Sequence, residues 1–153
     1  MSQTLPTKVA QIAIVVRNIE ESIAKYAALF GVEPPKPMTT APGLDVNQTY
    51  RGVPTNAQAK LAFFNLENVQ IELIEPLGGD SVWQEALDKN GESVQHIAFW
   101  VEGMPKVAEF LSTQGIEMVQ RGDMGDGQYA YFDAESTHGL TLELLEHKRT
   151  PFV

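Results

Sequence analysis

The sequence has no cysteine, few basic residues and no long hydrophobic run. Without cysteine there are no disulfides, no thiolate metal ligands and no thiol nucleophile, so we expect a cytoplasmic protein. The 11 Lys and Arg residues stand against 20 Asp and Glu, and the formal net charge of -9 argues against a nucleic-acid partner. No apolar stretch approaches the roughly 18 residues of a membrane span. The first residues also lack the basic-then-apolar pattern of a signal peptide, so no membrane partner is expected.

The chain of 153 residues is 43% hydrophobic and 20% charged, which is typical of a globular protein with an ordinary core. We expect residues 1–153 to form a single domain, because its two halves resemble each other. The segment "QIAIVV" (11–16) resembles "HIAFWV" (96–101). Each is followed by a helical pattern that ends in glycine, at residues 18–31 and 104–115.

A second matching pair follows later in each half. "AFFNLENVQIELIE" (62–75) resembles "AYFDAESTHGLTLELLE" (130–146), which carries a short insertion, and each predicts two strands joined by a polar turn. The chain therefore reads as two β-α-β-β-β repeats, 8–76 and 92–147, joined by a helical linker at 80–91.

The remaining strand of each repeat has the weakest pattern. It is expected within residues 45–53 of the first half and within 117–122 of the second. The proline-rich segment 32–43 and the glycine-rich segment 121–127 are expected to be loops.

Four polar residues interrupt otherwise apolar strands at matched positions of the two repeats. Residues two apart share one face of a strand, so each strand has one apolar face that can pack against helices. The opposite faces each carry one metal-capable side chain: Gln11, Glu72, His96 and Glu143. Taken singly, a glutamate can face solvent, a glutamine can lie at an edge, and a histidine can be a hydrogen-bonded core residue. Their matched placement favours a metal site.

The chemistry of this set fits one divalent ion per chain. An imidazole, an amide oxygen and two carboxylates suit Zn, Co, Ni or Mn, and the ion cancels the charge of the two glutamates, which are costly to bury alone. Four protein ligands leave room for substrate only if coordination expands, which points to a catalytic site. His138 and His147 have no counterpart in the other repeat and are interpreted as structural or exposed.

At these residues the chain resembles the vicinal oxygen chelate superfamily, which includes glyoxalases, bleomycin-resistance proteins and dioxygenases. "IELIEPLGGDS" (71–81), "GESVQHIAFWVEGM" (91–104) and "HGLTLELLE" (138–146) are most similar to methylmalonyl-CoA epimerases, whereas the four candidate ligands resemble those of zinc-type glyoxalase I. The resemblance implies an α+β fold in which the paired repeats form a cup-shaped, curved mixed β-sheet with helices outside. It also implies a homodimer.

Three positions depart from one or other of these families. Epimerases of this type carry a further glutamate base, where ungapped counting back from Glu72 reaches Asn56 in this chain. Glyoxalase I has a glutathione-binding asparagine after its first glutamate strand, where this chain has "EPLGGDS" (75–81). Gln11 also replaces the histidine that is usual in the first strand.

The resemblance implies proton transfer at a carbon next to a carbonyl, with Glu143 as the first candidate base and Glu72 as its counterpart. Three functions remain open for a small-molecule substrate: an isomerase or epimerase that acts through an enediolate on a carbonyl or acyl-CoA compound, a glyoxalase-type lactoylglutathione lyase, or a ligand-binding protein of the bleomycin-resistance type. The candidate substrate-binding residues are Tyr50, Arg51, Lys60, Trp100, Tyr129 and Tyr131.

Overall fold

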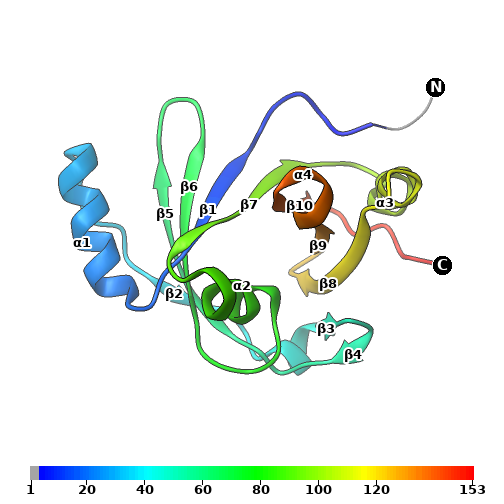
Figure 1. Cartoon of the computed structure of the whole chain (residues 1–153), viewed down its shortest axis with the longest axis horizontal. Coiled ribbons are helices and arrows are strands. Elements are labelled where there is room, and N and C mark those ends of the chain that lie inside the picture. Colours follow the sequence, from blue (N-terminus) through cyan, green and yellow to red (C-terminus); the bar gives the residue numbers. More distant parts are fainter. Residues whose placement is uncertain (1–3) are drawn as a thin grey trace.

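The computed structural model describes residues 4–153 as one ten-stranded sheet with helices packed against it (Figure 1). The strands are β1 (Gln11–Val15), β2 (Met38–Thr39), β3 (Thr49–Tyr50), β4 (Val53–Pro54), β5 (Ala59–Asn65), β6 (Gln70–Pro76), β7 (Ser93–Trp100), β8 (Glu117–Met124), β9 (Gly127–Ala134) and β10 (Leu140–Glu146). The helices are α1 (Ile19–Phe30), α2 (Val82–Asn90), α3 (Met104–Thr113) and α4 (Glu135–His138), with a 3-10 helix η1 (Gly43–Val46). Within residues 4–153, none of the helices is both long and apolar enough to cross a membrane.

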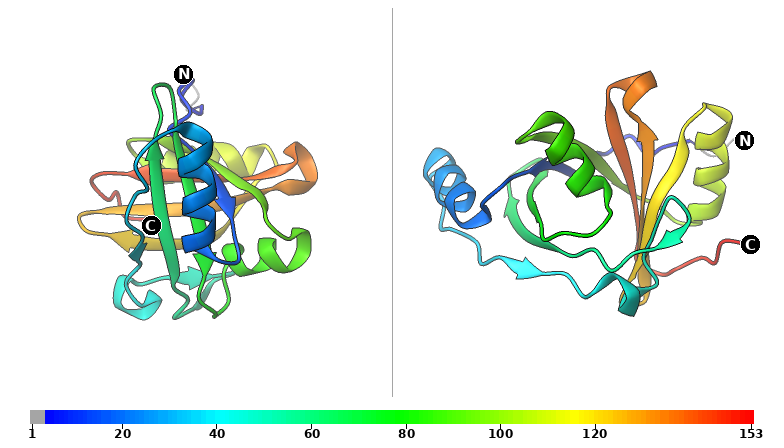
Figure 2. Two further views of the ribbon diagram at one scale, coloured as in Figure 1. Left: turned by 90° about the vertical axis from the view of Figure 1, so that its left-hand side faces the viewer. Right: turned by 60° about the horizontal axis from the view of Figure 1, so that its bottom comes forward.

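The sheet has the order β2-β5-β6-β1-β7-β10-β9-β8-β3-β4, which displays the internal repeat directly. In the first half β1 lies parallel to β6, and in the second half β7 lies parallel to β10. The halves join through the antiparallel pair of β1 and β7 at the middle of the sheet. Figure 2 shows the curvature of this mixed sheet, and the predicted α+β cup is confirmed.

The predicted helices begin and end where their capping residues indicate. The Asn18 side chain accepts a hydrogen bond from the Glu21 amide at 3.1 Å, and Gly31 ends α1 with a φ of 66°. In the predicted linker helix, Ser81 caps α2 by accepting from the Gln84 amide at 3.0 Å.

The weakest strand of the first repeat was predicted in the wrong place. The outer strand next to β5 is β2, inside the segment expected to be a loop, whereas β3, inside the expected 45–53 range, crosses over and pairs with β8. The glycine-rich loop expected at 121–127 is also wrong, because β8 continues to Met124 and β9 begins at Gly127. These pairings depend on partners distant in the sequence, which local patterns do not contain. The insertion in the second repeat is α4.

Three helices pack on the sheet from different sides. Ile19, Ile23 and Ala27 of α1 contact the outer apolar face of the first half, and Val107 and Leu111 of α3 do the same in the second. Figure 2 shows α1 and α3 at the two outer sides and α2 between them. The side chains of Val82 and Trp83 on α2 pack with Ala13, Val15 and Ile74 on the inner face. Two helices are therefore outside, as expected, and α2 covers part of the interior.

Glu146 at the end of β10 connects several elements of the second half of the molecule by hydrogen bonds. Its carboxylate accepts hydrogen bonds from the Gly103 and Met104 amides at the start of α3, at 2.7 and 3.0 Å. It also accepts from Gln128 on β9 and from both the amide and the hydroxyl of Thr150. Burial favours a raised pKa, but these hydrogen bonds outweigh it and lower the pKa of Glu146 to about 2.

Candidate metal centre

The sheet register places two candidate ligands symmetrically on the central strands. Gln11 of β1 lies opposite Ala98 of β7, and His96 of β7 lies opposite Ala13 of β1. The small alanine side chains leave space over the middle of the sheet. The antiparallel pairing therefore relates the two repeats by an approximate twofold axis between these strands.

The two glutamates come from the flanking strands. Glu72 of β6 pairs with Ala13, and Glu143 of β10 pairs with Ala98. On its other side Glu72 is opposite Phe63, whereas Glu143 is opposite Tyr131. The four polar residues thus meet on the inner face, with an aromatic side chain beside each carboxylate.

The four side chains converge on one small volume. The Nε2 atom of His96 lies 2.8 Å from Glu143 Oε2, 3.6 Å from Glu72 Oε1 and 3.1 Å from Gln11 Oε1. All four residues are buried, and His96 has no exposed surface. Suitable ligand atoms of Glu72, His96 and Glu143 lie within 4.8 Å of one another, so the structure contains a triad that can hold a metal ion.

The neighbour of His96 selects the tautomer that metal binding needs. Gln95 Oε1 lies 2.5 Å from His96 Nδ1 and accepts its hydrogen. The lone pair of Nε2 then faces the oxygens of Gln11, Glu72 and Glu143. Four electron pairs directed at one point repel each other unless a cation lies between them, so this donor set fits a divalent metal ion.

The amide of Gln11 can take two orientations. In the first, its nitrogen donates to Gln70 Oε1 at 2.7 Å, and Gln70 in turn donates to Asn65 at 2.8 Å. This turns the oxygen of Gln11 inward, as a metal ligand requires. With the amide reversed, its nitrogen would lie 3.2 Å from an oxygen of each glutamate, an arrangement suited to a site without a cation.

The carboxylates are electrostatically costly without a counter-charge. Burial raises the pKa of Glu72 well above its ordinary value, and the nearby Glu143 carboxylate raises it further. A divalent cation bound between the two glutamates would remove both penalties.

A cavity of about 580 Å³ lies over this cluster, and Gln11, Glu72 and Glu143 form part of its wall. Of the predicted substrate-binding residues, Trp100, Tyr129 and Tyr131 line it. Most of the remaining wall is apolar and includes Met38, Leu61, Phe63, Trp83 and Leu145. Burial raises the pKa of both tyrosines, so their hydroxyl groups remain protonated at neutral pH.

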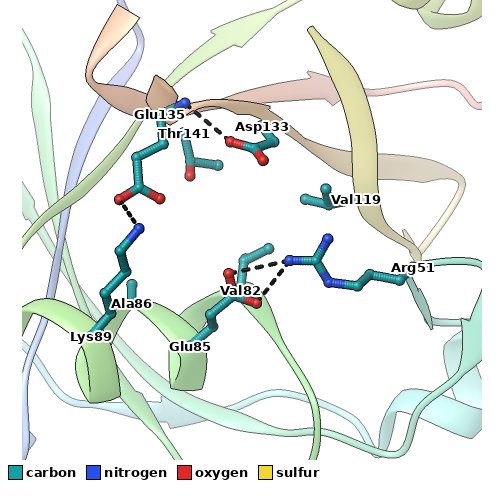
Figure 3. A pocket seen from close by; sticks show the side chains of 9 residues that line it. All are labelled: Arg51, Val82, Glu85, Ala86, Lys89, Val119, Asp133, Glu135 and Thr141. Atoms are coloured by element: carbon teal, nitrogen blue, oxygen red, sulfur yellow. Dashed lines mark hydrogen bonds and ion pairs between the residues drawn. The ribbon is translucent and has the colours of Figure 1, made fainter. Parts of the chain in front are cut away.

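The other three predicted substrate-binding residues lie away from this cavity. Arg51 forms an ion pair with Glu85 at 3.0 Å, in a separate small niche beside α2 and α4, where Lys89 also pairs with Glu135 (Figure 3). Tyr50 donates its hydroxyl hydrogen to the same Glu85. Lys60 pairs with Glu20 of α1 at 3.4 Å. The structure therefore does not bring these three residues to the cluster of Gln11, Glu72, His96 and Glu143.

A family comparison places this arrangement among known proteins. Residues 10–132 match the family model described as Glyoxalase/Bleomycin resistance protein/Dioxygenase superfamily. The chain belongs to this superfamily. The predicted superfamily membership is confirmed. The match covers the first repeat and most of the second, and it ends within β9, before the strand β10 that carries Glu143.

Two sequence relatives and two solved structures extend the comparison. The chain is 34% identical over 95 residues to YqjC of Bacillus subtilis (strain 168), covering 60% of this chain and 67% of that protein. It is 29% identical over 144 residues to the mitochondrial methylmalonyl-CoA epimerase of Dictyostelium discoideum, covering 91% and 78%. The structure resembles methylmalonyl-CoA epimerase from Mycobacterium tuberculosis with a TM-score of 0.61 at 21% identity, covering 99% and 93%. It also resembles a methylmalonyl-CoA epimerase in complex with methylmalonyl-CoA and NH4+, with a TM-score of 0.64 at 23% identity. This similarity covers 95% of this chain and 99% of that chain.

Sequence reasoning missed Gln95, although it directly precedes His96. Strict alternation along β7 puts Gln95 on the face opposite His96. The pairing with β1 contains an irregularity, however: Ala13 pairs with His96 while Ile14 pairs with Val94, so Gln95 is the extra residue of a β-bulge. The polar residue directly before the candidate ligand His96 was the signal in the sequence that could have identified Gln95.

Proposed function

We propose that this superfamily member is a divalent-metal-dependent isomerase of the epimerase type. It removes a proton from a carbon next to a carbonyl group, which leaves an enolate, and then returns a proton to that carbon. The convergence of Gln11, Glu72, His96 and Glu143 beneath a mostly apolar cavity carries this proposal. The sequence similarity to an epimerase over 91% of the chain supports the reaction type.

The four polar residues would hold the cation, which supplies a positive charge that stabilises an enolate oxygen of the substrate. Glu143 is the proposed base, and Glu72 is its counterpart on the other side of the twofold axis. The two carboxylates have unequal surroundings, because Tyr131 with its hydroxyl group pairs with Glu143 while Phe63 pairs with Glu72. Trp83 fixes that hydroxyl by donating to it at 3.0 Å.

The position where related epimerases carry a further glutamate offers no base in this chain. The Asn56 side chain is exposed and accepts a hydrogen bond from the Leu44 amide at 3.1 Å. Asp123 lines the cavity, but hydrogen bonds from Asn47 and Arg121 lower its pKa despite burial, which makes it a weak base. In this proposal both proton-transfer roles therefore fall to Glu72 and Glu143.

The lactoylglutathione lyase is retained as a second candidate, because the four proposed ligands resemble those of glyoxalase I. The two reactions share a proton transfer next to a carbonyl but differ in substrate. Metal-loaded protein should be assayed against methylmalonyl-CoA, neutral acyl thioesters and the methylglyoxal–glutathione adduct. We expect metal-dependent exchange of the substrate's acidic hydrogen with deuterium from solvent. Absence of exchange with every compound, at full metal occupancy, would favour the ligand-binding alternative.

A single domain, a small-molecule substrate, a homodimer and a cytoplasmic location complete the proposal. Cell fractionation tests the location directly. Recovery of the protein outside the cytoplasm would contradict it.

A further inference from the structure

The charges of the proposed metal site sum to zero. Glu72 and Glu143 contribute two negative charges when both bind the metal, whereas Gln11 and the His96 tautomer set by Gln95 are neutral. A divalent cation cancels the two carboxylates. The centre then has no surplus positive charge to offer an anionic group of the substrate.

The walls of the cavity supply no positive charge either. Among the residues of the described chain that line it, there is no lysine and no arginine. The one further charged group is Asp123, which is negative and already bound to Arg121 at 2.8 Å and Arg149 at 3.3 Å. An anion entering the cavity would therefore meet mostly apolar side chains, uncharged polar groups such as Thr40 and Gln48, and one carboxylate that already engages its two arginines.

The cations that the sequence offered for this purpose are engaged elsewhere. Arg51 pairs with Glu85 in its separate niche, and Lys60 pairs with Glu20. A carboxylate at the reacting end of a substrate would add one uncompensated negative charge to a buried site. Such a charge is costly in surroundings of low polarity.

We propose that the substrate presents an uncharged oxygen group to this site, a ketone, ester, amide, thioester or hydroxycarbonyl, in place of a free carboxylate. This inference rests on the proposed function and specifies its substrate class. When Glu143 takes the proton, the enolate gains the charge that Glu143 loses. With a neutral substrate, the total charge of the site therefore stays at zero throughout the reaction. With a substrate that carries a free carboxylate, the site holds one negative charge throughout.

Two probes of nearly identical shape test the proposal. One is methylmalonyl-pantetheine, and the other is its primary amide, in which the free carboxylate is replaced by a carboxamide; both lack the nucleotide phosphates of CoA. Dissociation constants from calorimetry on the metal-loaded protein should favour the amide by about tenfold or more. Equal or tighter binding of the acid would overturn the proposal.

A pair of lysine variants tests the electrostatic cause. Met38→Lys places a cation on the cavity wall at a residue that is 53% exposed on edge strand β2. It should improve binding of the acid relative to the amide by about tenfold. Leu29→Lys adds the same charge on α1, at a residue that is 74% exposed and outside the cavity, and should leave the ratio unchanged. An unchanged ratio in Met38→Lys would overturn the electrostatic explanation.

Deuterium exchange into both probes separates this inference from the proposed function. Exchange of the acid at a rate equal to or above that of the amide would contradict the neutral substrate but leave the isomerase standing. Metal-loaded protein that binds the amide preferentially and exchanges no hydrogen in any compound would contradict the isomerase, while the charge preference would stand as a property of the site.

Discussion

The amide oxygen of Gln95 lies 2.5 Å from Nδ1 of His96, inside the protein, with both residues on the same strand. The contact exists because a β-bulge brings Gln95 to the side of His96. The amide nitrogen of Gln95 has no hydrogen-bond partner within the described residues. Within residues 4–153, this amide therefore makes its hydrogen bond through the oxygen, which is directed at the histidine.

Replacement of Gln95 should weaken metal binding only indirectly, through its effect on the imidazole of His96. We expect Gln95→Leu to lower the affinity for Zn or Co by about 10- to 100-fold, since the imidazole loses the acceptor that fixes its tautomer. Gln95→Glu keeps an acceptor of similar size and should retain most of the affinity. Competition with a chelating dye measures both constants. Equal affinities for Gln95→Leu and the wild type would show that this contact does not position the ligand.

His96→Ala should remove most of the metal. Purified wild-type protein is expected to carry about one divalent ion per chain, because the four proposed ligands form one site. His138→Ala is the matched control, since His138 is exposed and lies outside the cluster. Elemental analysis of the three proteins gives the occupancy. Full occupancy in His96→Ala would refute the proposed ligand set.

Glu143→Gln should separate metal binding from chemistry. The amide keeps an oxygen ligand of nearly the same volume but removes the basicity, and Gln11 is already an amide in the same set. We expect turnover of a confirmed substrate to fall by about two to four orders of magnitude while substantial metal remains. Rates must be compared at matched occupancy. A wild-type rate in fully metallated Glu143→Gln would leave Glu143 as a ligand only and move the base to Glu72.

Glu146→Gln should destabilise the fold. In the native state the pKa of Glu146 is lowered to about 2, so its ionised form contributes stability that is present above the unfolded-state pKa of roughly 4.3. That contribution declines as the pH falls toward about 2. We expect the variant to lose about 2 kcal/mol at pH 7, with a smaller difference near pH 2.5.

Urea unfolding at several pH values measures this effect. Glu109→Gln is the control, because Glu109 is an exposed residue of α3 and its substitution should change stability little at any pH. A pH-independent difference between the wild type and Glu146→Gln would contradict the role of the ionised carboxylate.

The homodimer remains a prediction of its own. The sheet ends at β2 and β4, each of which leaves unpaired backbone groups at an edge that a second chain can cover. Light scattering should give about twice the chain mass of 16.9 kDa. A monomer mass that does not change with concentration would count against the dimer.

The sequence by itself determined the repeats, the helix ends and the four converging polar residues. Each of these follows from local rules: Asn18 and Gly31 cap a helix wherever it packs, and two-residue alternation fixes the faces on which Glu72 and Glu143 lie. The matched positions in two repeats then placed the residues together, since equivalent strands meet around one axis.

Tertiary structure decided the remaining features, because they depend on partners that the local pattern does not contain. The sequence predicts Arg51 and Lys60 as substrate-binding cations, whereas the fold pairs them with Glu85 and Glu20. The strand β3 pairs with β8 of the other repeat, and the bulge reverses the direction that alternation assigns to Gln95. Alternation along a strand assumes regular pairing, whereas a bulge and a crossover arise only from the fit between distant strands.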